Sequence, residues 1–384
     1  MKINFDIVTV LLGMIIAQAF FAAVLLWFFP ANRLANRFLS LLTAAMATWL
    51  VDSFFRVSGI YGQDPNYYFL PIFYSLGFGP LIYYYVRSLT NREFTFKAVY
   101  LLHFIPVVLQ TSLYLFLRTQ SYDFRNWYWH TVHKPYLYRL EFDGTWISLL
   151  IYLLLSIRLL QGYQQWVKEQ FSEVSQLQLQ WLKILLTLTA LISLQWLVEL
   201  VLRDVYNSYF QYDYSNWLLS GLVLLISIMG LRQANLYQAH YEGLTKQPVQ
   251  HSAEIDTQLV DRISFALVHD RLYLNPTLTL AELARYLKAP VKSVSVAINA
   301  GLGQSFNQLI NAHRVDQVKR RLSTADWDKL TLLAIALESG FNSKTTFNRI
   351  FKEHTGVSPR QWLLERTNPD LERPKTSFGA TGPF

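Results

Sequence analysis

One short stretch near the C-terminal end of the chain carries side chains that could bind a nucleic acid. At helical spacing, its polar members share one side, and they are cationic or rich in hydrogen-bond donors: Lys344, Thr345, Asn348, Arg349 and Lys352. Arg and Asn side chains can bond the edges of purine bases, and Lys can neutralise phosphate. A helix with this face is therefore expected to fit the major groove of DNA.

The residues around this stretch predict two helices joined by a tight turn within residues 331–359. Gly340 supplies the backbone freedom that a turn of three to four residues requires, and Ser343 is predicted to cap the second helix. The residues expected around an apolar core in the first helix are Leu333, Ile335, Ala336 and Leu337. Those expected on the inner face of the second helix are Phe347, Ile350 and Phe351.

A similar pattern begins at Leu278. Thr279 and Glu282 have the spacing of a capping box, so a helix is predicted to start there and to run to about Leu287. Pro290 suits the opening of a second helix. The residues predicted to point inward from this second helix are Val291, Val294 and Ile298, and those predicted to point outward are Lys292, Ser295, Val296 and Asn299.

A further helix is predicted between these two patterns, over residues 306–322. Its buried residues are expected to be Leu309, Ile310, Val315, Val318 and Leu322. Its polar side is expected to carry His313, Arg314, Lys319, Arg320 and Arg321. A basic helix face is commonly only solvated, but two such patterns with a matching helix between them favour DNA binding.

Residues 259–363 resemble the paired helix-turn-helix DNA-binding domain of the AraC/XylS family of bacterial transcription regulators. The stretches GFNSKTTFNRIFKEHTGVSP and INAHRVDQVKRRL match this family in residue type and spacing. The resemblance implies two recognition helices in successive major-groove segments, held apart by a linker helix, and promoter DNA as the partner. It places Thr346 and Ser293 among the DNA-facing residues, and Val296 stands where many members have Arg. The full set of expected DNA-contacting residues is Lys292, Ser293, Asn299, Arg314, Lys344, Thr345, Thr346, Asn348, Arg349 and Lys352.

The composition indicates that most of the preceding chain lies in a membrane. Hydrophobic residues make up 52% of the 384 residues and charged residues only 16%, with the apolar excess before Gln233. There are no cysteines, so disulfides and thiolate metal sites are excluded, and no cofactor or metal is expected. Seven apolar segments are predicted to span the bilayer: 7–29, 38–57, 67–86, 98–117, 145–161, 183–201 and 216–231.

An odd number of spans places the two termini on opposite sides of the membrane. Because a DNA-binding C-terminal domain must be cytoplasmic, the N-terminus is expected outside the bacterial inner membrane. The distribution of basic residues agrees, since Arg33, Arg37 and Arg87 fall in loops assigned to the inside. The net charge of +8 suits anionic lipid as well as nucleic acid.

Two features of the membrane part could bind a signal. Residues 118–143 are expected to form an outer loop rich in aromatic residues, including Trp127 and Trp129. This loop is either an interfacial aromatic belt or a lid over an outward-facing ligand pocket. Two acid and base pairs also lie four residues apart within spans: Asp52 with Arg56, and Glu199 with Arg203. They either neutralise one another near the headgroups or line, with Gln195, a polar cavity for a charged ligand.

The sequence thus predicts an all-α chain: a seven-helix transmembrane sensor bundle (1–232), a linker (233–256), a tandem helix-turn-helix DNA-binding domain (257–366) and a disordered tail (367–384). The expected function is that of a membrane-anchored transcription regulator controlled by a periplasmic or membrane signal. RNA polymerase and a second copy of the chain are further candidate partners. No catalytic signature is visible, so no enzyme is expected; the alternative is a membrane enzyme or transporter with a regulatory DNA-binding appendage. A signal is expected to pass through the linker, so a flexible insertion near Gly243 should uncouple the halves.

Overall fold

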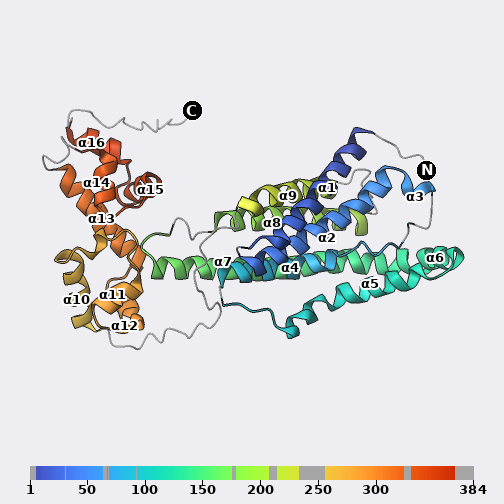
Figure 1. The fold of residues 1–384 in the computed structure, drawn as a ribbon, viewed down its shortest axis with the longest axis horizontal. Coiled ribbons are helices and arrows are strands. Elements are labelled where there is room, and N and C mark those ends of the chain that lie inside the picture. Colours follow the sequence, from blue (N-terminus) through green and yellow to red (C-terminus); the bar gives the residue numbers. More distant parts are fainter. Residues whose placement is uncertain are drawn as a thin grey trace, which may run out of the picture. The chain divides into compact units, whose positions relative to one another are not determined.

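The computed structural model describes residues 6–30, 32–63, 67, 69–91, 93–174, 179–206, 214–232, 256–323 and 330–367. These residues are helical or irregular, and the described part has no strand beyond one isolated bridge, between Phe171 and Thr279. The prediction of an all-α chain is confirmed for them. The chain divides into two compact units (Figure 1). The N-terminal unit comprises Met1–Gln164 and Gln176–Gln247, and the C-terminal unit comprises Gln165–Ser175 and Pro248–Phe384.

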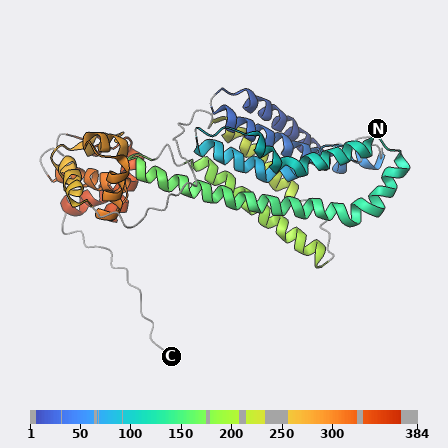
Figure 2. The same ribbon diagram turned by 90° about the horizontal axis from the view of Figure 1, so that it is seen from below.

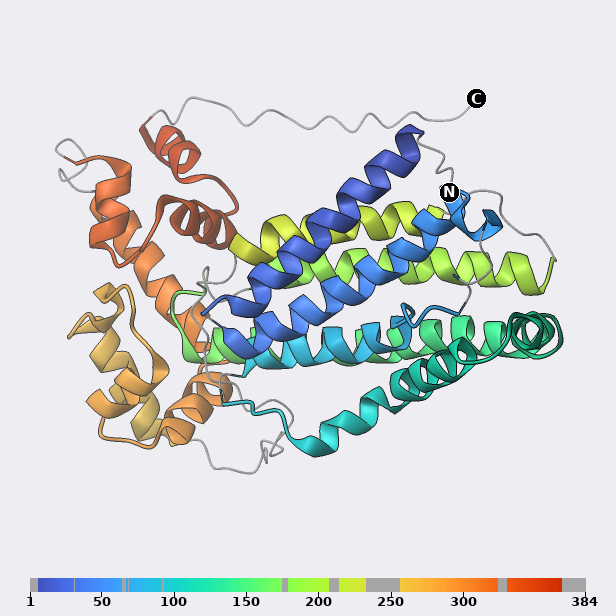
Figure 3. The same ribbon diagram turned by 45° about the vertical axis from the view of Figure 1, so that its right-hand side comes forward.

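Among the described residues, five helical segments are long and apolar enough to cross a membrane: Ile7–Phe28, Arg33–Val57, Ala98–Arg118, Tyr122–Gln170 and Gln180–Asp204. A shorter apolar helix covers Asn216–Gly230. The helices of the N-terminal unit are α1 (Ile7–Phe28), α2 (Arg33–Val57), α3 (Ile60–Gln63), α4 (Phe78–Thr90), α5 (Ile105–Arg118), α6 (Tyr122–Tyr128), α7 (Tyr138–Gln170), α8 (Gln180–Asp204) and α9 (Tyr214–Arg232). Helices α1 and α2 lie side by side and also contact α9 (Figure 3).

The predicted third span, 67–86, is helical only in its second half. A short 3-10 turn, Ser75–Gly77, leads into α4, and residues 69–74 are not helical. Pro71 has no N–H to donate and disfavours a helical conformation in Leu70, the residue before it. Phe69 also has a positive φ of 61°. The prediction of a continuous helix over this range is therefore wrong.

The predicted outer loop, 118–143, is also helical. Ser121 caps α6 by accepting a hydrogen bond from the N–H of Phe124, at 3.3 Å. A π-helical segment, Trp129–Leu137, then joins α6 to α7, and Pro135 lies inside it. A π turn accommodates local irregularity such as a missing donor. The segment predicted as an outer loop is thus largely helical, and Figure 2 shows α7 continuing from this region as one long helix.

In the C-terminal unit, the helices are α10 (Thr257–Val268), α11 (Leu280–Tyr286), α12 (Val291–Val296), α13 (Phe306–Leu322), α14 (Leu332–Glu338), α15 (Lys344–Thr355) and α16 (Pro359–Thr367). Helix α11 begins with the predicted capping box of Thr279 and Glu282, which is confirmed. A second capping box, Ser305 with Gln308, opens α13. These side chains accept hydrogen bonds from backbone N–H groups at the start of the helix, which have no partner within it.

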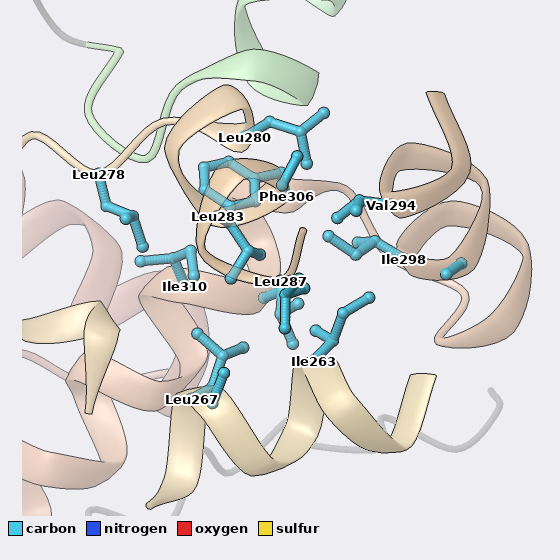
Figure 4. Packing of buried hydrophobic residues seen from close by; sticks show 14 of the residues in the cluster. Ile263, Leu267, Leu278, Leu280, Leu283, Leu287, Val294, Ile298, Phe306 and Ile310 are labelled. Atoms are coloured by element: carbon cyan, nitrogen blue, oxygen red, sulfur yellow. The ribbon is translucent and has the colours of Figure 1, made fainter. Parts of the chain in front are cut away.

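Two apolar cores divide this unit. The first joins α10, α11 and α12 to the start of α13, through Leu283, Ile298 and Phe306 among others (Figure 4). The second joins the end of α13, including Val315 and Val318, to α14, α15 and α16. The five residues of α13 predicted to be buried are buried, so this prediction is confirmed. We call α11 with α12 the first helix pair and α14 with α15 the second helix pair; α13 belongs to the cores of both.

Candidate nucleic-acid interface

Helix α15 presents two different faces. Phe347, Ile350 and Phe351 are buried in the second core, as predicted. Ser343 caps the helix by accepting a hydrogen bond from the N–H of Thr346, at 3.2 Å. The exposed residues of the opposite face are Lys344, Thr345, Asn348, Arg349 and Lys352. These side chains can therefore reach a partner outside the domain without disturbing its core.

Thr346 does not belong to this exposed face. Its side chain is only 6% exposed, and its hydroxyl accepts a hydrogen bond from the Ser343 hydroxyl at 3.1 Å. Its position one helical turn before Ile350 directs it toward the core. The prediction that Thr346 faces DNA is therefore wrong.

Arg349 forms a weak surface ion pair within α15. Its guanidinium lies 2.8 Å from the carboxylate of Glu353, one turn further along α15. Both side chains are exposed, and surface pairs at this spacing contribute only about 0.3–0.5 kcal/mol. The pair orients Arg349 weakly, and binding to a base edge or a phosphate can replace it.

The turn of the second helix pair depends on Gly340. This residue has a φ of +96°, which favours glycine. A Cβ atom at this position would lie 2.5 Å from the carbonyl oxygen of Tyr273 and 2.9 Å from Nε of Arg314. In α14 before it, Ile335 and Ala336 are buried, whereas Leu333 and Leu337 are exposed, so the inward prediction holds for only half of that set. These four residues fall within little more than one turn and point all around the helix, so they cannot all face one core.

The first helix pair presents a smaller polar surface. Val294 and Ile298 are buried as predicted, but Val291 is 40% exposed at the start of α12, which corrects its inward assignment. Lys292 and Ser293 are exposed on α12. Asn299 is exposed on the π turn Ala297–Gly301 that follows α12, and its amide donates to the Ser295 hydroxyl at 3.2 Å. The outward side of α12 and this π turn carries one cation, Lys292, against three on the exposed face of α15.

Arg314 is buried at the junction of the two cores, with only 1% of its surface exposed. Its Nε donates to the carbonyl of Tyr273 at 2.8 Å, and its terminal nitrogen donates to the carbonyl of Asn275 at 2.7 Å. Burial lowers the pKa of Arg314 to about 10, and the charge of Glu173 opposes this shift. The prediction that Arg314 contacts DNA is wrong. Its position, four residues after Ile310 and four before Val318, places it on the buried face of α13.

Comparison with known proteins agrees with this geometry. Residues 283–365 match the family model described as a helix-turn-helix domain. The C-terminal unit contains a helix-turn-helix domain of the AraC type. The matched residues of this helix-turn-helix domain begin within α11 and end within α16, so they include both helix pairs and α13.

Curated relatives match over the same part of the chain. An uncharacterized HTH-type transcriptional regulator of Staphylococcus aureus strain COL is 29% identical over 106 residues, which make up 28% of this chain and 14% of the relative. The corresponding regulators of strains MSSA476 and N315 match to the same extent. The chain thus spans only about a seventh of the length of these relatives. No solved structure matches the chain.

The candidate signal-binding residues all lie in the N-terminal unit. Asp52 pairs with Arg56 at 2.6 Å and accepts a hydrogen bond from the Tyr61 hydroxyl at 2.5 Å. Trp127 is exposed on α6, whereas Trp129 stacks on the ring of His133 with centroids 4.9 Å apart. Asp52 and Arg56, the first predicted acid and base pair, are thus neighbours as expected.

Glu199 and Arg203, the second predicted pair, each bond to other residues. Gln195 donates to Glu199 at 3.1 Å. Arg203 donates to Asp143 of α7 and to Asp204, both at 2.8 Å. No local pattern in the sequence indicates Asp143 as a partner of Arg203, because the two residues are 60 positions apart. Arg203 thereby joins α7 to α8.

Proposed function

We propose that this protein is a membrane-anchored transcription regulator that binds promoter DNA through its C-terminal unit. The observation that carries this proposal is the exposed face of α15, which holds three cations and two further hydrogen-bonding side chains above a buried aromatic core. The match of this region to a helix-turn-helix domain supports it, as do the relatives named transcriptional regulators.

In this proposal, α15 and α12 enter successive segments of the major groove. Asn348 and Arg349 are placed to bond base edges, with Arg suited to guanine and Asn to adenine. Lys344 and Lys352 neutralise phosphates, together with Lys292 of the first helix pair. The second helix pair carries most of the base reading, since Val296 of α12 offers only apolar contact. Double-stranded promoter DNA is thus the principal partner.

The N-terminal unit serves as the anchor and the sensor in this proposal. Five apolar helical segments long enough to cross a bilayer support membrane insertion. The basic residues of the connecting segments favour an outer N-terminus and a cytoplasmic DNA-binding unit. The candidate contacts for a signal are Asp52, Arg56, Trp127, Trp129, Glu199 and Arg203.

Replacing Arg349 by alanine is expected to lower affinity for the preferred DNA about tenfold to a hundredfold. The loss follows from one bidentate base contact, which is worth about 1–3 kcal/mol. The wild-type chain, embedded in lipid nanodiscs, first selects its preferred duplex from a random-sequence library. Fluorescence anisotropy then compares the affinity of wild type and variant for that duplex and for a scrambled one.

Arg360 is the matched control for this experiment. It is an exposed arginine on α16 of the same unit and lies outside the proposed recognition face. Arg360→Ala should leave the preference for the selected duplex unchanged. Lys352→Ala should weaken binding to both duplexes. It should also reduce the slope of log affinity against log salt concentration by about one, the value for one phosphate contact. Equal losses of preference for Arg349→Ala and Arg360→Ala would contradict the assignment of α15 as the reading helix.

A further inference from the structure

The end of α7 contributes a segment to the C-terminal unit. Helix α7 runs from Tyr138 to Gln170, and residues Gln165–Ser175 cluster with the helix-turn-helix domain rather than with the other helices of the N-terminal unit. After α7, the chain passes through Phe171–Val174, which we call the clip. Within the clip, Ser172 is 2% exposed. A buried polar residue in a connection between helices needs hydrogen-bond partners.

The first partner of the clip is the segment that opens α11. The N–H of Ser172 donates to the carbonyl of Leu278 at 3.2 Å, and the Ser172 hydroxyl donates to the same oxygen at 2.7 Å. Phe171 and Thr279 form an antiparallel bridge. Thr279 is also the capping residue of α11. The clip therefore bonds to the first helix pair at the residues where α11 begins.

The second partner of the clip is α13. The amide of Asn307 donates to the carbonyls of Phe171, at 3.2 Å, and Ser172, at 2.7 Å. Asn311 donates to the Ser172 carbonyl at 3.4 Å, and Arg314 donates to its hydroxyl at 3.2 Å. Every polar group of Ser172 is thus bonded to the helix-turn-helix domain. Leu278, Asn307, Asn311 and Arg314 together form the surface that binds the clip.

Arg314 extends these contacts to the second helix pair. The same side chain that bonds Ser172 also bonds the carbonyls of Tyr273 and Asn275. Its Nε and the Tyr273 carbonyl lie against Gly340, which forms the turn between α14 and α15. A displacement of Ser172 therefore removes a bond from the residue on which the junction of the two pairs depends.

We propose that the clip fixes the placement of the two helix pairs relative to each other, so that α7 controls the affinity of the domain for DNA bearing two half-sites. This inference rests on the proposed function and names the regulatory route of the same site. Holding both pairs in one arrangement reduces the ordering that accompanies binding, which raises affinity for a two-site duplex. Affinity for a single half-site does not depend on the arrangement. This regulatory route runs through the end of α7 and the clip, whereas the sequence predicts a route through the linker near Gly243.

A cysteine pair tests the clip directly. The chain contains no cysteine, so Phe171→Cys with Thr279→Cys introduces the only two thiols. The bond from Ser172 N to the Leu278 carbonyl makes residues 171 and 279 a pair without direct hydrogen bonds, the closer kind of antiparallel pair and one suited to a disulfide. Mass spectrometry of the full chain in nanodiscs measures the disulfide. Anisotropy then measures affinity for the selected duplex and for a version with one half-site scrambled.

We expect the oxidised double variant to bind the two-site duplex about tenfold more tightly than the same protein after reduction, with equal affinity for the half-site duplex. Asn307→Ala, which removes two bonds to the clip, should weaken two-site binding about tenfold. The controls are Gln258→Ala, an exposed residue of α10, and a Gly/Ser insertion after Gly243, both of which should leave two-site binding unchanged.

Each result decides between the two proposals. If no disulfide forms, or if two-site affinity is the same in both redox states and in Asn307→Ala, the clip has no regulatory role. If the insertion after Gly243 weakens two-site binding as much as Asn307→Ala does, the route through the clip is wrong. If wild type selects no duplex at all, the proposed DNA-binding function fails, and the clip proposal fails with it.

Discussion

Gly340→Ala is expected to destabilise the second helix pair by about 2–4 kcal/mol and to abolish DNA binding by the domain. The backbone at residue 340 has a φ of +96°, which an alanine adopts only with strain. The added Cβ would also lie 2.5 Å from the Tyr273 carbonyl oxygen and 3.1 Å from Cα of Leu274. Two of its three nearest atoms belong to backbone, which cannot move aside as a flexible side chain can. The turn would therefore have to open.

Gly303→Ala is the matched control. Gly303 also has a positive φ, +69°, but a Cβ atom there would meet nothing within 4 Å. This variant should lose only about 1 kcal/mol, from backbone strain alone. Hydrogen exchange of α14 and α15 in the full chain, with urea added stepwise, measures both losses. Similar losses in the two variants would show that the close approach to Tyr273 has no energetic weight.

Arg314→Ala is expected to destabilise the C-terminal unit by about 3–5 kcal/mol. The change leaves the carbonyls of Tyr273 and Asn275 without their donors, at about 1–3 kcal/mol for each buried group, and opens a cavity between the two cores. Arg314→Lys should lose less, because an ammonium keeps the charge but lacks the planar fork that reaches both oxygens. Two measurements on the full chain in nanodiscs give these losses: thermal unfolding, and hydrogen exchange of the amides of α13.

Arg320→Ala provides the comparison for Arg314. Arg320 lies on the exposed side of the same helix, where it donates to Gln317 at 3.0 Å, so its removal should change stability by less than about 1 kcal/mol. The comparison also separates two roles for Arg314. If Arg314→Ala kept full stability but bound DNA weakly, Arg314 would be a DNA contact after all, and a purely structural role would be wrong.

Local patterns were sufficient where they act over a few residues. The capping box at Thr279 and the limits of α13 follow from spacings of three and four, and the structure has them as predicted. The charge of Arg314 suggests a DNA contact, but its position on α13 puts it on the same face as the buried Ile310 and Val318. Position along the helix is the stronger guide, since a cation can be buried where carbonyls surround it.

Other features needed contacts that no local pattern contains. Ser172 and Leu278 are separated by 106 residues, and nothing in the sequence around either residue indicates the pairing. Asp143 and Arg203 are similar. In the N-terminal unit, long apolar runs locate most of the helices, but apolar character alone does not show that residues 69–74 are irregular and that α4 begins only at Phe78.

Under the proposed function, the length of α13 has a consequence for the DNA site. Its 17 residues form a rod of about 25 Å, and its two ends are fixed in separate cores. A rod of this length allows the two half-sites to be no further apart than about one turn of B-form DNA, roughly 10 base pairs. Adding about 5 base pairs between them would turn one half-site to the far side of the duplex. DNA sites selected by the chain should therefore share a strict phase between their two half-sites, whatever their bases are.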